Sequence, residues 1–397
     1  MKIKLKEIGK IITGKTPPKN EKDAYGNTMN FLTPGDLKGQ RFSDITARQL
    51  SEKGVRGLKN NIVSGPSISV SCIGSNMGKT IFNKEAIITN QQLNSITFIR
   101  NDVNPLYLYY LLISKRELLH FIGSNQGSTM PILNKKDFGN LEFEIPSFEE
   151  QNYISGKLNL LDRKIELNNQ INDNLISQLK IISNSYFSYF EAYNGKIPLD
   201  WSYTKLVDIT NIDAGYSYTS KELVDSNIAM ATIKNFDRTG GFNIRGFKEI
   251  KPNKIVKKEK YAKLFDILVA HTDLTQNADI IGNAEPILNT SKYSKIIYSM
   301  DLVKVTPKAE KISPFLLALL LQGDRFKKHC LGYVNGTTVL HLSKKALKEF
   351  EFPFPTSFSD LDNIAKFAER NYKLISNNMK ENQKLQNLKQ VLLSKYF

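Results

Sequence analysis

The glycine-rich segment at residues 72–80 is the stretch of this sequence that comes closest to a catalytic motif. It runs Cys72-Ile73-Gly74-Ser75-Asn76-Met77-Gly78-Lys79-Thr80. A nucleotide phosphate loop needs four residues between its first glycine and the Gly-Lys-Thr end, whereas Gly74 and Gly78 enclose three. The apolar pair Ile81-Phe82 follows and favours a hairpin over a helix. We therefore predict a basic hairpin that can approach a DNA backbone through Ser75, Asn76 and Lys79.

Histidine and cysteine, the side chains most often used as metal ligands and nucleophiles, show no catalytic spacing. The chain has four histidines and two cysteines, and none of them forms a paired metal-ligand motif. The sequence contains neither a Gly-x-Gly-x-x-Gly fingerprint nor a Gly-x-Ser-x-Gly elbow, and its acidic residues are scattered. We expect no catalytic site, no metal site and no cofactor in this chain.

Binding chemistry is better represented, above all in the run at residues 245–263. It holds many cations against two acidic residues, Glu249 and Glu259: Arg245, Lys248, Lys251, Lys254, Lys257, Lys258, Lys260 and Lys263. Such a run can neutralise several phosphates, and each contact adds to affinity and to its salt dependence. A solvated, flexible basic loop is the alternative.

Polar turns in both halves offer amides and hydroxyls suited to base edges and phosphates. We align residues 272–277 and 335–338 of the second half with the turns around Asn90 and Gly127 of the first. Turn formation alone also places Asn and Gly in loops. The candidate DNA-binding residues are Lys15, Thr16, Lys19, Ser75, Asn76, Lys79, Asn90, Gln91, Gln92, Gln126, Ser128, Thr129, Tyr216, Tyr218, Arg245, Lys248, Lys257, Lys258, Thr272, Gln276, Thr337 and Thr338.

The overall charge points to the same kind of partner. The 397 residues carry a formal net charge of +16, and nucleic acid is the commonest polyanion that such an excess binds. A Lys-, Asn- and Ile-rich composition also arises from the base composition of a coding sequence, so charge alone leaves both explanations open.

The length and the apolar pattern describe a folded chain of two or three domains. No apolar run approaches the ~20 residues of a membrane span, and the N-terminal Met1-Lys2-Ile3-Lys4 lacks the apolar stretch of a signal peptide. Cys72 and Cys330 lie in different halves and indicate reduced thiols. We expect a cytoplasmic protein without membrane association.

An internal repeat organises these candidate residues. Residues 127–138 align with residues 336–347 at a shift of 209, and both copies continue through a strand to a proline. Each half also has a glycine turn, a helix with a first-turn proline (Pro105 or Pro314), and strand-like runs. These runs lie at residues 30–33, 67–71 and 95–98 in the first half, and at residues 228–232, 266–270 and 299–303 in the second.

A heptad seam follows each copy and predicts a long helix that packs along another helix. Two asparagines in each seam, at matching depths, can fix the register of an antiparallel pair. The alternative is two independent amphipathic helices, each on its own domain. The predicted seam residues are Ile154, Leu158, Leu161, Ile165, Asn168, Asn172, Leu175, Leu179, Ile182, Ile364, Ile375, Asn378, Asn382, Leu385 and Leu392.

The predicted fold class is therefore α+β, with two similar mixed α/β heads separated by a pair of long antiparallel coiled-coil helices in a pseudo-two-fold internal repeat. The predicted boundaries are a first head at residues 1–146, a central helix at 147–192, a second head at 193–355 and a C-terminal helix at 356–397.

The whole pattern resembles the specificity subunit of a type I restriction–modification system. The first half carries the resemblance, through the Gly14 turn, the Asn90 turn, and the segment from Gly127 to Pro146 that runs into Phe148-Glu149-Glu150-Gln151 and the helix. The second half departs from it, with Gly215-Tyr216-Ser217-Tyr218 at the first turn, no Asn-Gln-Gln, and Ser359-Asp360-Leu361-Asp362 before the helix.

The resemblance implies a non-catalytic subunit whose heads are target recognition domains for the two halves of a bipartite DNA target. It also implies that the helices set the spacer and dock two methyltransferase subunits, which bring S-adenosylmethionine and carry out DNA methylation, and that restriction motor-nuclease subunits join this core. Because the loops of the two heads differ, we expect an asymmetric target. Two other hypotheses are a nucleotide-dependent enzyme that uses residues 74–80, and a coiled-coil scaffold that binds RNA or an acidic protein.

Overall fold

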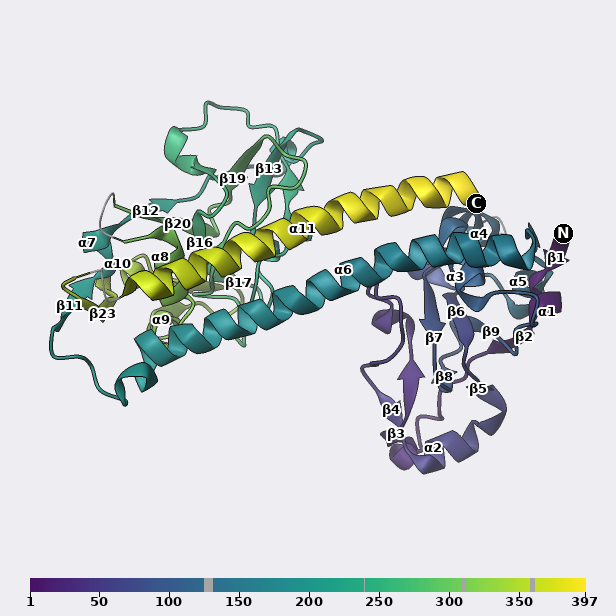
Figure 1. The fold of residues 1–397 in the computed structure, drawn as a ribbon. Helices are drawn as coiled ribbons and strands as arrows, with labels where there is room; N and C mark the ends of the chain where they lie inside the picture. The colour runs from purple at the N-terminus through teal and green to yellow at the C-terminus, as the bar shows by residue number, and fades with distance from the viewer. Residues whose placement is uncertain (125–130, 239, 309–311, 358–360) are drawn as a thin grey trace. The chain divides into compact units, whose positions relative to one another are not determined.

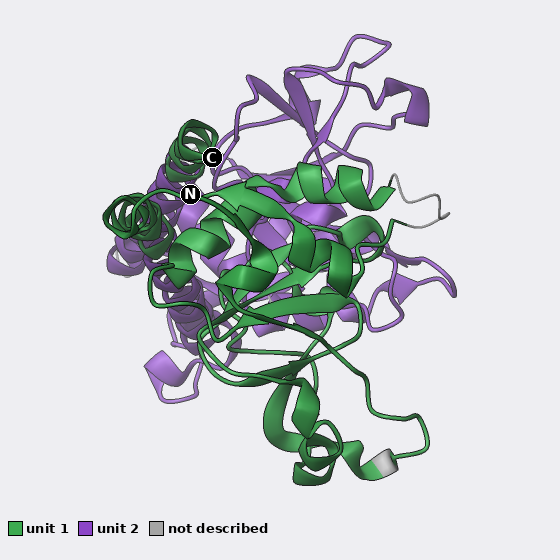
Figure 2. Cartoon of the chain, turned by 90° about the vertical axis from the view of Figure 1, so that its right-hand side faces the viewer, with its two compact units in different colours: residues 1–164, 385–397 green, residues 165–384 purple. Residues whose placement is uncertain are grey.

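The computed structural model describes residues 1–397 except 125–130, 239, 309–311 and 358–360. It divides into two compact units (Figure 2): unit 1 comprises residues 1–164 and 385–397, and unit 2 comprises residues 165–384. Figure 1 gives the order of helices and strands along the chain. Within the described residues, no helix combines the length and the apolar content needed to cross a membrane.

Unit 1 is built on two four-stranded sheets, with strand orders β2-β9-β6-β7 and β4-β3-β8-β5, and on the pair β1-β10. The strands are β1 (Lys2–Lys4), β2 (Lys10–Thr13), β3 (Tyr25–Leu32), β4 (Gln49–Leu50), β5 (Ile62–Val63), β6 (Ser67–Ser71), β7 (Thr80–Asn83), β8 (Ile87–Thr89), β9 (Leu93–Thr97) and β10 (Glu142–Glu144). The helices before the long one are α1 (Leu5–Ile8), α2 (Glu52–Gly57), α3 (Pro105–Ser114), α4 (Arg116–Ser124) and α5 (Lys135–Asn140).

Unit 2 repeats this topology strand for strand. Its sheets have the orders β12-β20-β16-β18 and β14-β13-β19-β15, its strand pair is β11-β23, and a small sheet β17-β22-β21 is added. The strands are β11 (Trp201–Lys205), β12 (Thr210–Ala214), β13 (Ile228–Ala231), β14 (Lys248–Glu249), β15 (Tyr261–Ala262), β16 (Ile267–Ala270), β17 (Thr272–Asp273), β18 (Ala284–Pro286), β19 (Lys295–Tyr298), β20 (Leu302–Pro307), β21 (Val334–Asn335), β22 (Leu340–Leu342) and β23 (Glu351–Pro355). The helices are α7 (Leu206–Ile209), α8 (Pro314–Leu321), α9 (Asp324–Leu331) and α10 (Lys345–Glu349).

Local sequence explains where the repeated helices begin. Pro105 and Pro314 are the first residues of α3 and α8, where a missing N–H costs nothing. Asn104 caps α3 by accepting from the amides of Leu106 and Tyr107 at 2.8 and 3.1 Å. Ser313 caps α8 in the same way. The prediction of first-turn prolines is confirmed in both halves.

Two long helices complete the fold, α6 (Phe148–Ser183) and α11 (Asp362–Tyr396). α6 continues into a π-helical turn, Asn184–Ser188, so its regular part ends before the predicted limit. All of the predicted seam residues are buried or half-buried, whereas Leu160, Leu167 and Ile171 on the same helix are 66%, 52% and 43% exposed. Helix α6 has apolar residues at core and at surface positions, and the heptad spacing correctly identified those in the core.

The two helices run antiparallel inside each unit. In unit 1, Lys389 donates to both carboxylate oxygens of Asp162 at 2.7 and 2.9 Å. In unit 2, Asn378 donates its amide to Asn172 at 2.9 Å, and Asn168 donates to Asn382 at 2.8 Å. Numbers rise along α6 as they fall along α11, so the prediction of an antiparallel seam with paired asparagines is confirmed and the two-independent-helices alternative is wrong.

Both long helices contribute to the core of each unit. In unit 1, Ile154 and Leu158 of α6 and Leu393 of α11 belong to one buried cluster with the strands and with α3. In unit 2, Leu179 of α6 and Tyr372 of α11 belong to a cluster that also holds β16, β20 and α8. Neither head closes its core without segments of both helices.

The asparagine pairs give a first prediction. Asn172→Leu leaves the buried Asn378 amide without its partner, so it should lower the unfolding free energy of unit 2 by about 1–3 kcal/mol. The double variant Asn172→Leu/Asn378→Leu should restore or exceed the original stability, because two apolar side chains replace a buried polar pair. Denaturant unfolding followed by Trp201, the single tryptophan, which lies in the unit 2 core, measures both.

Asn174→Ala on the exposed face of α6 is the matched control, with an expected change within about 0.5 kcal/mol. A double variant as unstable as the single one would show that the amide pair is not what holds this part of the seam.

Candidate nucleic-acid interface

In unit 1, two of the predicted contact loops lie against each other. The Gly14 turn binds the segment at residues 89–93 through its backbone: Gly14 N donates to Leu93 O at 3.1 Å and Lys15 N donates to Thr89 O at 2.8 Å. Thr16 Oγ1 adds a bond of 2.5 Å to Gln91 Oε1. A Cβ on Gly14 would lie 2.2 Å from the Asn90 carbonyl oxygen, so this approach requires glycine.

The Asn90 turn is held from inside. Asn90 is 9% exposed; its Oδ1 accepts from the Gln92 amide at 3.0 Å, and its Nδ2 donates to Gln92 Oε1 at 3.1 Å. Gln91, between them, is exposed. Asn90 therefore fixes the turn, and Gln91 is the amide that the turn presents.

The glycine-rich segment forms the predicted hairpin. β6 and β7 pair antiparallel, and Gly78, with a φ of +78°, donates its N–H to Ser71 O at 2.8 Å. No helix follows Lys79 and Thr80, which lead directly into β7. The segment therefore lacks the loop-to-helix geometry of a phosphate loop.

Unit 2 holds its first turn with the same backbone bonds. Gly215 N donates to Leu302 O at 3.1 Å, and Tyr216 N donates to Tyr298 O at 2.7 Å. A Cβ on Gly215 would lie 1.9 Å from the Ser299 carbonyl oxygen. The counterpart of residues 89–92 is therefore residues 298–301, and Met300, 59% exposed, takes the place of Gln91.

The alignment of residues 272–277 with the Asn90 turn is thus wrong. Residues 272–277 correspond to the hairpin segment instead, because Leu342 N donates to His271 O at 2.8 Å just as Leu133 N donates to Cys72 O at 2.9 Å. The expected strand at residues 299–303 is likewise displaced, since β20 begins at Leu302. The shift of 209 that relates residues 127–138 to 336–347 also relates residues 89–92 to 298–301, so this signal could have located the turn.

The loop at residues 273–280 is nevertheless joined to another predicted contact segment. Gln276 Nε2 donates to Thr337 O at 2.6 Å, and Thr272 pairs with His341 in the small sheet. Asp273 accepts from the amides of Thr275 and Ile280 at 2.8 Å each. Burial opposes ionisation of Asp273, but these bonds hold its pKa below the usual value.

The basic run lies beside the Gly215 turn. Lys260 Nζ donates to Ala214 O at 2.6 Å, and the Lys254 ammonium lies 5.1 Å from the centre of the Tyr216 ring. Arg245, Lys257 and Lys258 are exposed. Some of the run's cations therefore support the turn, and the others face solvent.

Most of the predicted contact residues are exposed or half-buried in the described structure. They are Lys15, Thr16, Lys19, Ser75, Asn76, Lys79, Gln91, Gln92, Tyr218, Arg245, Lys248, Lys257, Lys258, Gln276, Thr337 and Thr338. Gln126, Ser128 and Thr129 lie outside the described residues.

Three predicted contacts need correction, because Asn90, Tyr216 and Thr272 are 9%, 4% and 6% exposed. The Tyr216 hydroxyl donates to Glu222 at 2.6 Å, and burial raises its pKa to about 12. Each of these side chains lies inside a turn or a sheet, so we assign them to holding loops and not to touching a ligand.

The described part of the chain contains no cluster of three His, Cys, Asp or Glu that could hold a metal ion. Cys72 and Cys330 are buried, and burial raises the pKa of each thiol to about 12. His271 is kept neutral at physiological pH, because burial lowers its pKa to about 4.

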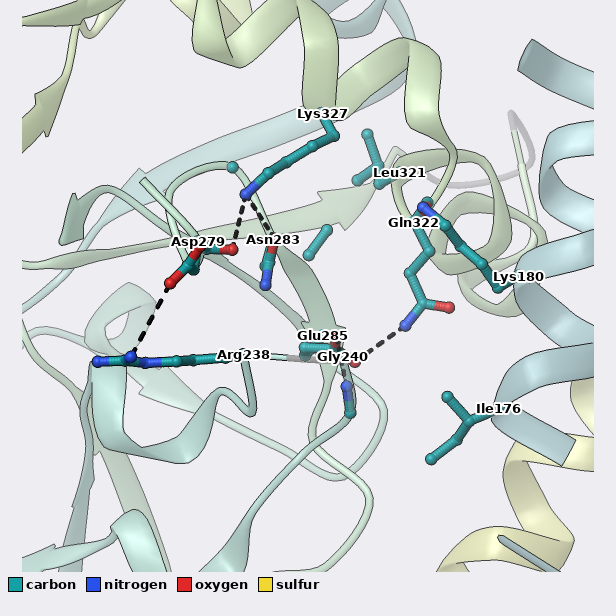
Figure 3. Close-up of a pocket in the computed structure, with 13 residues that line it drawn as sticks. Ile176, Lys180, Arg238, Gly240, Asp279, Asn283, Glu285, Leu321, Gln322 and Lys327 are labelled. Carbon is teal, nitrogen blue, oxygen red and sulfur yellow. Dashed lines mark hydrogen bonds and ion pairs between the residues drawn. The ribbon is translucent and has the colours of Figure 1, made fainter. Parts of the chain in front are cut away.

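Sequence reasoning missed a buried carboxyl in unit 2. Glu285 is 4% exposed; its oxygens accept from Gly241 N at 2.8 Å and from Gln322 Nε2 at 2.9 Å (Figure 3). Gln322 in turn accepts from the Tyr372 hydroxyl of α11 at 2.6 Å. Desolvation raises the pKa of Glu285 to about 7. Ile81 occupies the equivalent strand position in unit 1, so no shared pattern marked this residue.

These features define a class of protein: a duplicated α+β head in which backbone bonds hold polar loops, carried on antiparallel helices, with a basic surface run. The chain belongs to the family described as the type I restriction modification DNA specificity domain, whose model matches residues 1–176 and 198–387.

Two related proteins agree with this family membership. The chain is 23% identical over 387 residues to the type I restriction enzyme MjaVIII specificity subunit of Methanocaldococcus jannaschii, covering 89% of this chain and 81% of that protein. It is 26% identical over 244 residues to the MjaIX specificity subunit of the same organism, covering 58% of this chain and 56% of that protein. The chain thus spans about half the length of this second relative.

A solved structure shares the fold. The type I restriction–modification S subunit from M. genitalium matches with a TM-score of 0.57 and 16% sequence identity, over 100% of this chain and 96% of that chain. At this identity the match concerns the fold, and it confirms the predicted fold class.

Gly14→Ala tests the paired loops of unit 1. The new Cβ would overlap the Asn90 carbonyl oxygen, so the turn must separate and lose its bonds to Thr89 and Leu93. We expect a loss of about 1–3 kcal/mol of local stability, measured as faster amide hydrogen exchange at residues 14 and 15. Gly156→Ala in α6, where nothing lies within 4 Å of the added Cβ, is the control and should stabilise the helix by about 0.5–1 kcal/mol. Unchanged exchange at residues 14 and 15 would contradict the requirement for glycine.

Glu285 predicts a pH dependence of unit 2. Its pKa is about 7 in the folded state, against an ordinary value of 4.5 for glutamate, so the folded protein binds more protons between these pH values. Stability should therefore fall as pH rises from about 4.5 to 7 and change no further above, by a total on the order of 3 kcal/mol. Glu285→Gln should remove this slope in Trp201-detected unfolding. Equal pH slopes for the two proteins would show that Glu285 ionises normally.

Proposed function

We propose that this chain is the DNA-recognition subunit of a type I restriction–modification complex, and that each head contacts one half of a bipartite target. The observation that carries the proposal is the duplicated loop pair: the same backbone bonds hold residues 14–16 on 89–93 and residues 215–216 on 298–302, while the exposed side chain changes from Gln91 to Met300. A fixed frame with different presented groups suits two different half-sites, so the target is asymmetric.

The chain's role in this proposal is binding without catalysis. The adenine-methylating chemistry would come from two methyltransferase subunits that hold S-adenosylmethionine, and restriction from motor-nuclease subunits. Support for a docked partner comes from α6, where Leu167, Ile171 and Ile181 are 52%, 43% and 64% exposed. Apolar side chains gathered on one exposed helix suit a protein contact.

The basic surface supports DNA as the ligand. Arg245, Lys257 and Lys258 are exposed, and Lys257 and Lys258 lie next to Lys260, which contacts the Gly215 turn through Ala214; exposed cations of this kind can neutralise phosphates. In unit 1 a cavity of ≈ 510 Å³ between α1, β2 and α5 is lined by Lys6, Lys10, Lys135 and Lys136 and by no acidic residue.

Methylome sequencing of cells that carry this chain with its methyltransferase partner tests the proposal. We expect methylation at one asymmetric motif made of two short half-sites with an unspecified spacer, and its loss when this chain is deleted. The helix pair is proposed to set the spacer. Seven residues inserted after Leu175 and seven more before Ile375, which keep the heptad phase, should lengthen the spacer and leave both half-sites unchanged.

Methylation without a motif would favour a scaffold over a DNA reader. Half-sites that change while the spacer stays constant would overturn the role of the helices and leave the role of the heads intact.

A further inference from the structure

Unit 1 contains a cavity of ≈ 290 Å³ where the β6–β7 hairpin meets α3, α4 and α11. Its cationic lining residues are Lys38, Lys79, Arg116 and Lys389, and its lining includes no acidic residue. Lys79 follows the candidate contact residue Asn76 by three positions. The cavity is therefore a concentrated positive site next to a predicted DNA-contact loop.

Part of the positive charge of this cavity is uncompensated. Lys389 is neutralised by Asp162, at 2.7 and 2.9 Å. Lys38 interacts with the charge of Asp36, whose carboxylate also accepts from Thr33 and from the Ala47 amide. Lys79 donates to the Leu37 carbonyl, a neutral acceptor, at 3.3 Å. The side chain of Arg116 makes no hydrogen bond or ion pair with the described residues.

The hairpin is shaped to accept Arg116. Gly78 has a φ of +78°, and a Cβ there would lie 2.7 Å from Arg116 Cγ and 2.8 Å from the Arg116 carbonyl oxygen. Only a glycine allows the first residue of α4 to lie against the hairpin in this way. Arg116 and Lys79 both line the cavity as a result.

Unit 2 has the equivalent cavity, of ≈ 240 Å³ (Figure 3). Gly282, with a φ of +75°, donates to Ala270 O as Gly78 does to Ser71 O. Lys180 of α6 lines this cavity, as Lys389 of α11 lines the first one. The two cavities are therefore copies of one feature and provide an internal comparison.

The cations of the second cavity are already occupied. Lys180 pairs with Asp324 at 2.5 Å, and Arg238 pairs with Asp279 at 3.9 Å. Lys327 donates to the carbonyl oxygens of Ala278, Asp279 and Ile281 and to Asn283 Oδ1. Asp279 and Glu285 line the cavity as well. An incoming anion would meet carboxyl groups and committed donors.

We propose that the unit 1 cavity is an anion-binding site that takes one phosphodiester group of the DNA backbone, and that the unit 2 cavity does not. This inference rests on the proposed function, and it adds that the two heads grip the backbone unequally. Arg116 supplies a planar fork suited to phosphate oxygens, and Lys38 and Lys79 supply point charges. The site carries no base information, so it should add affinity without altering the motif.

The test measures binding of the chain, with its methyltransferase partner, to its target duplex over a range of salt concentrations. Loss of one phosphate contact in the double variant Lys38→Gln/Arg116→Gln should reduce the slope of log K against log salt by about 0.9, and should weaken binding roughly eightfold at 0.1 M salt. Arg116→Lys, which keeps the charge, should retain most of the slope. Arg238→Gln in unit 2 is the matched control and should leave the slope unchanged.

A second measurement identifies the anion. Single methylphosphonate substitutions along the half-site should reveal one position at which loss of the phosphate charge weakens binding by the original chain but not by the double variant. A double variant with unchanged slope on a duplex that the original chain recognises would overturn the cavity proposal alone. A chain that recognises no bipartite motif would instead overturn the proposed function.

A different outcome would indicate that the cavity binds a protein group instead of a DNA phosphate. If the double variant weakens assembly with the methyltransferase subunits in the absence of DNA and keeps its salt slope, the cavity holds an acidic side chain of that partner and the phosphodiester proposal is wrong.

Discussion

The antiparallel helix seam is the constraint on which the rest of each unit depends. Unit 1 combines residues 1–164 with residues 385–397, because Leu393 of α11 belongs to the same buried cluster as Ile154, Leu158 and α3. In unit 2 the core takes Leu179 from α6 and Tyr372 from α11. A head cannot complete its core from its own strands, so head and helix pair must fold together.

Buried amides give this seam its register. An all-apolar seam of this length would tolerate shifts by a heptad, since leucine packs equally well against leucine one repeat away. The Asn172–Asn378 and Asn168–Asn382 pairs permit one register, because any shift leaves amides buried and unbonded. The seam gives up some stability for this specificity, as buried polar pairs in coiled coils do.

The two copies of the repeat share their backbone contacts, whereas side chains at equivalent positions differ. The carbonyl and amide groups that bind Gly14 and Gly215 are the same in the two units, and so are those that bind Gly78 and Gly282. At equivalent positions, unit 1 has Gln91 where unit 2 has Met300, and Ile81 where unit 2 has Glu285. Main-chain bonds do not depend on the side chain, so a loop can change its chemistry while its place in the sheet stays fixed.

Periodic features of the fold could be predicted from the sequence, and features set by tertiary contacts were missed. The seam was predictable because its residues recur at steps of three and four, and α3 and α8 because Pro105 and Pro314 mark their first turns. The Met300 turn was missed because the repeat shift of 209 was not applied to residues 89–92, whose polar side chains have no match at residues 298–301; the backbone bond to residues 215–216 identifies it. Tyr216 looked like a surface aromatic in a turn, but Glu222 and the sheet enclose it.

The net charge shows most clearly what the sequence alone does not reveal. A net charge of +16 counts every cation, whether or not the fold gives it a partner. Lys260 holds the carbonyl oxygen of Ala214 and Lys389 holds Asp162. Lys304, 8% exposed, donates to Tyr261 O at 2.7 Å. These charges are part of the net charge of +16, but they are committed to the fold. What decides where a polyanion binds is the smaller set of cations, such as Arg116, that the folded units leave in a cavity without a carboxylate partner.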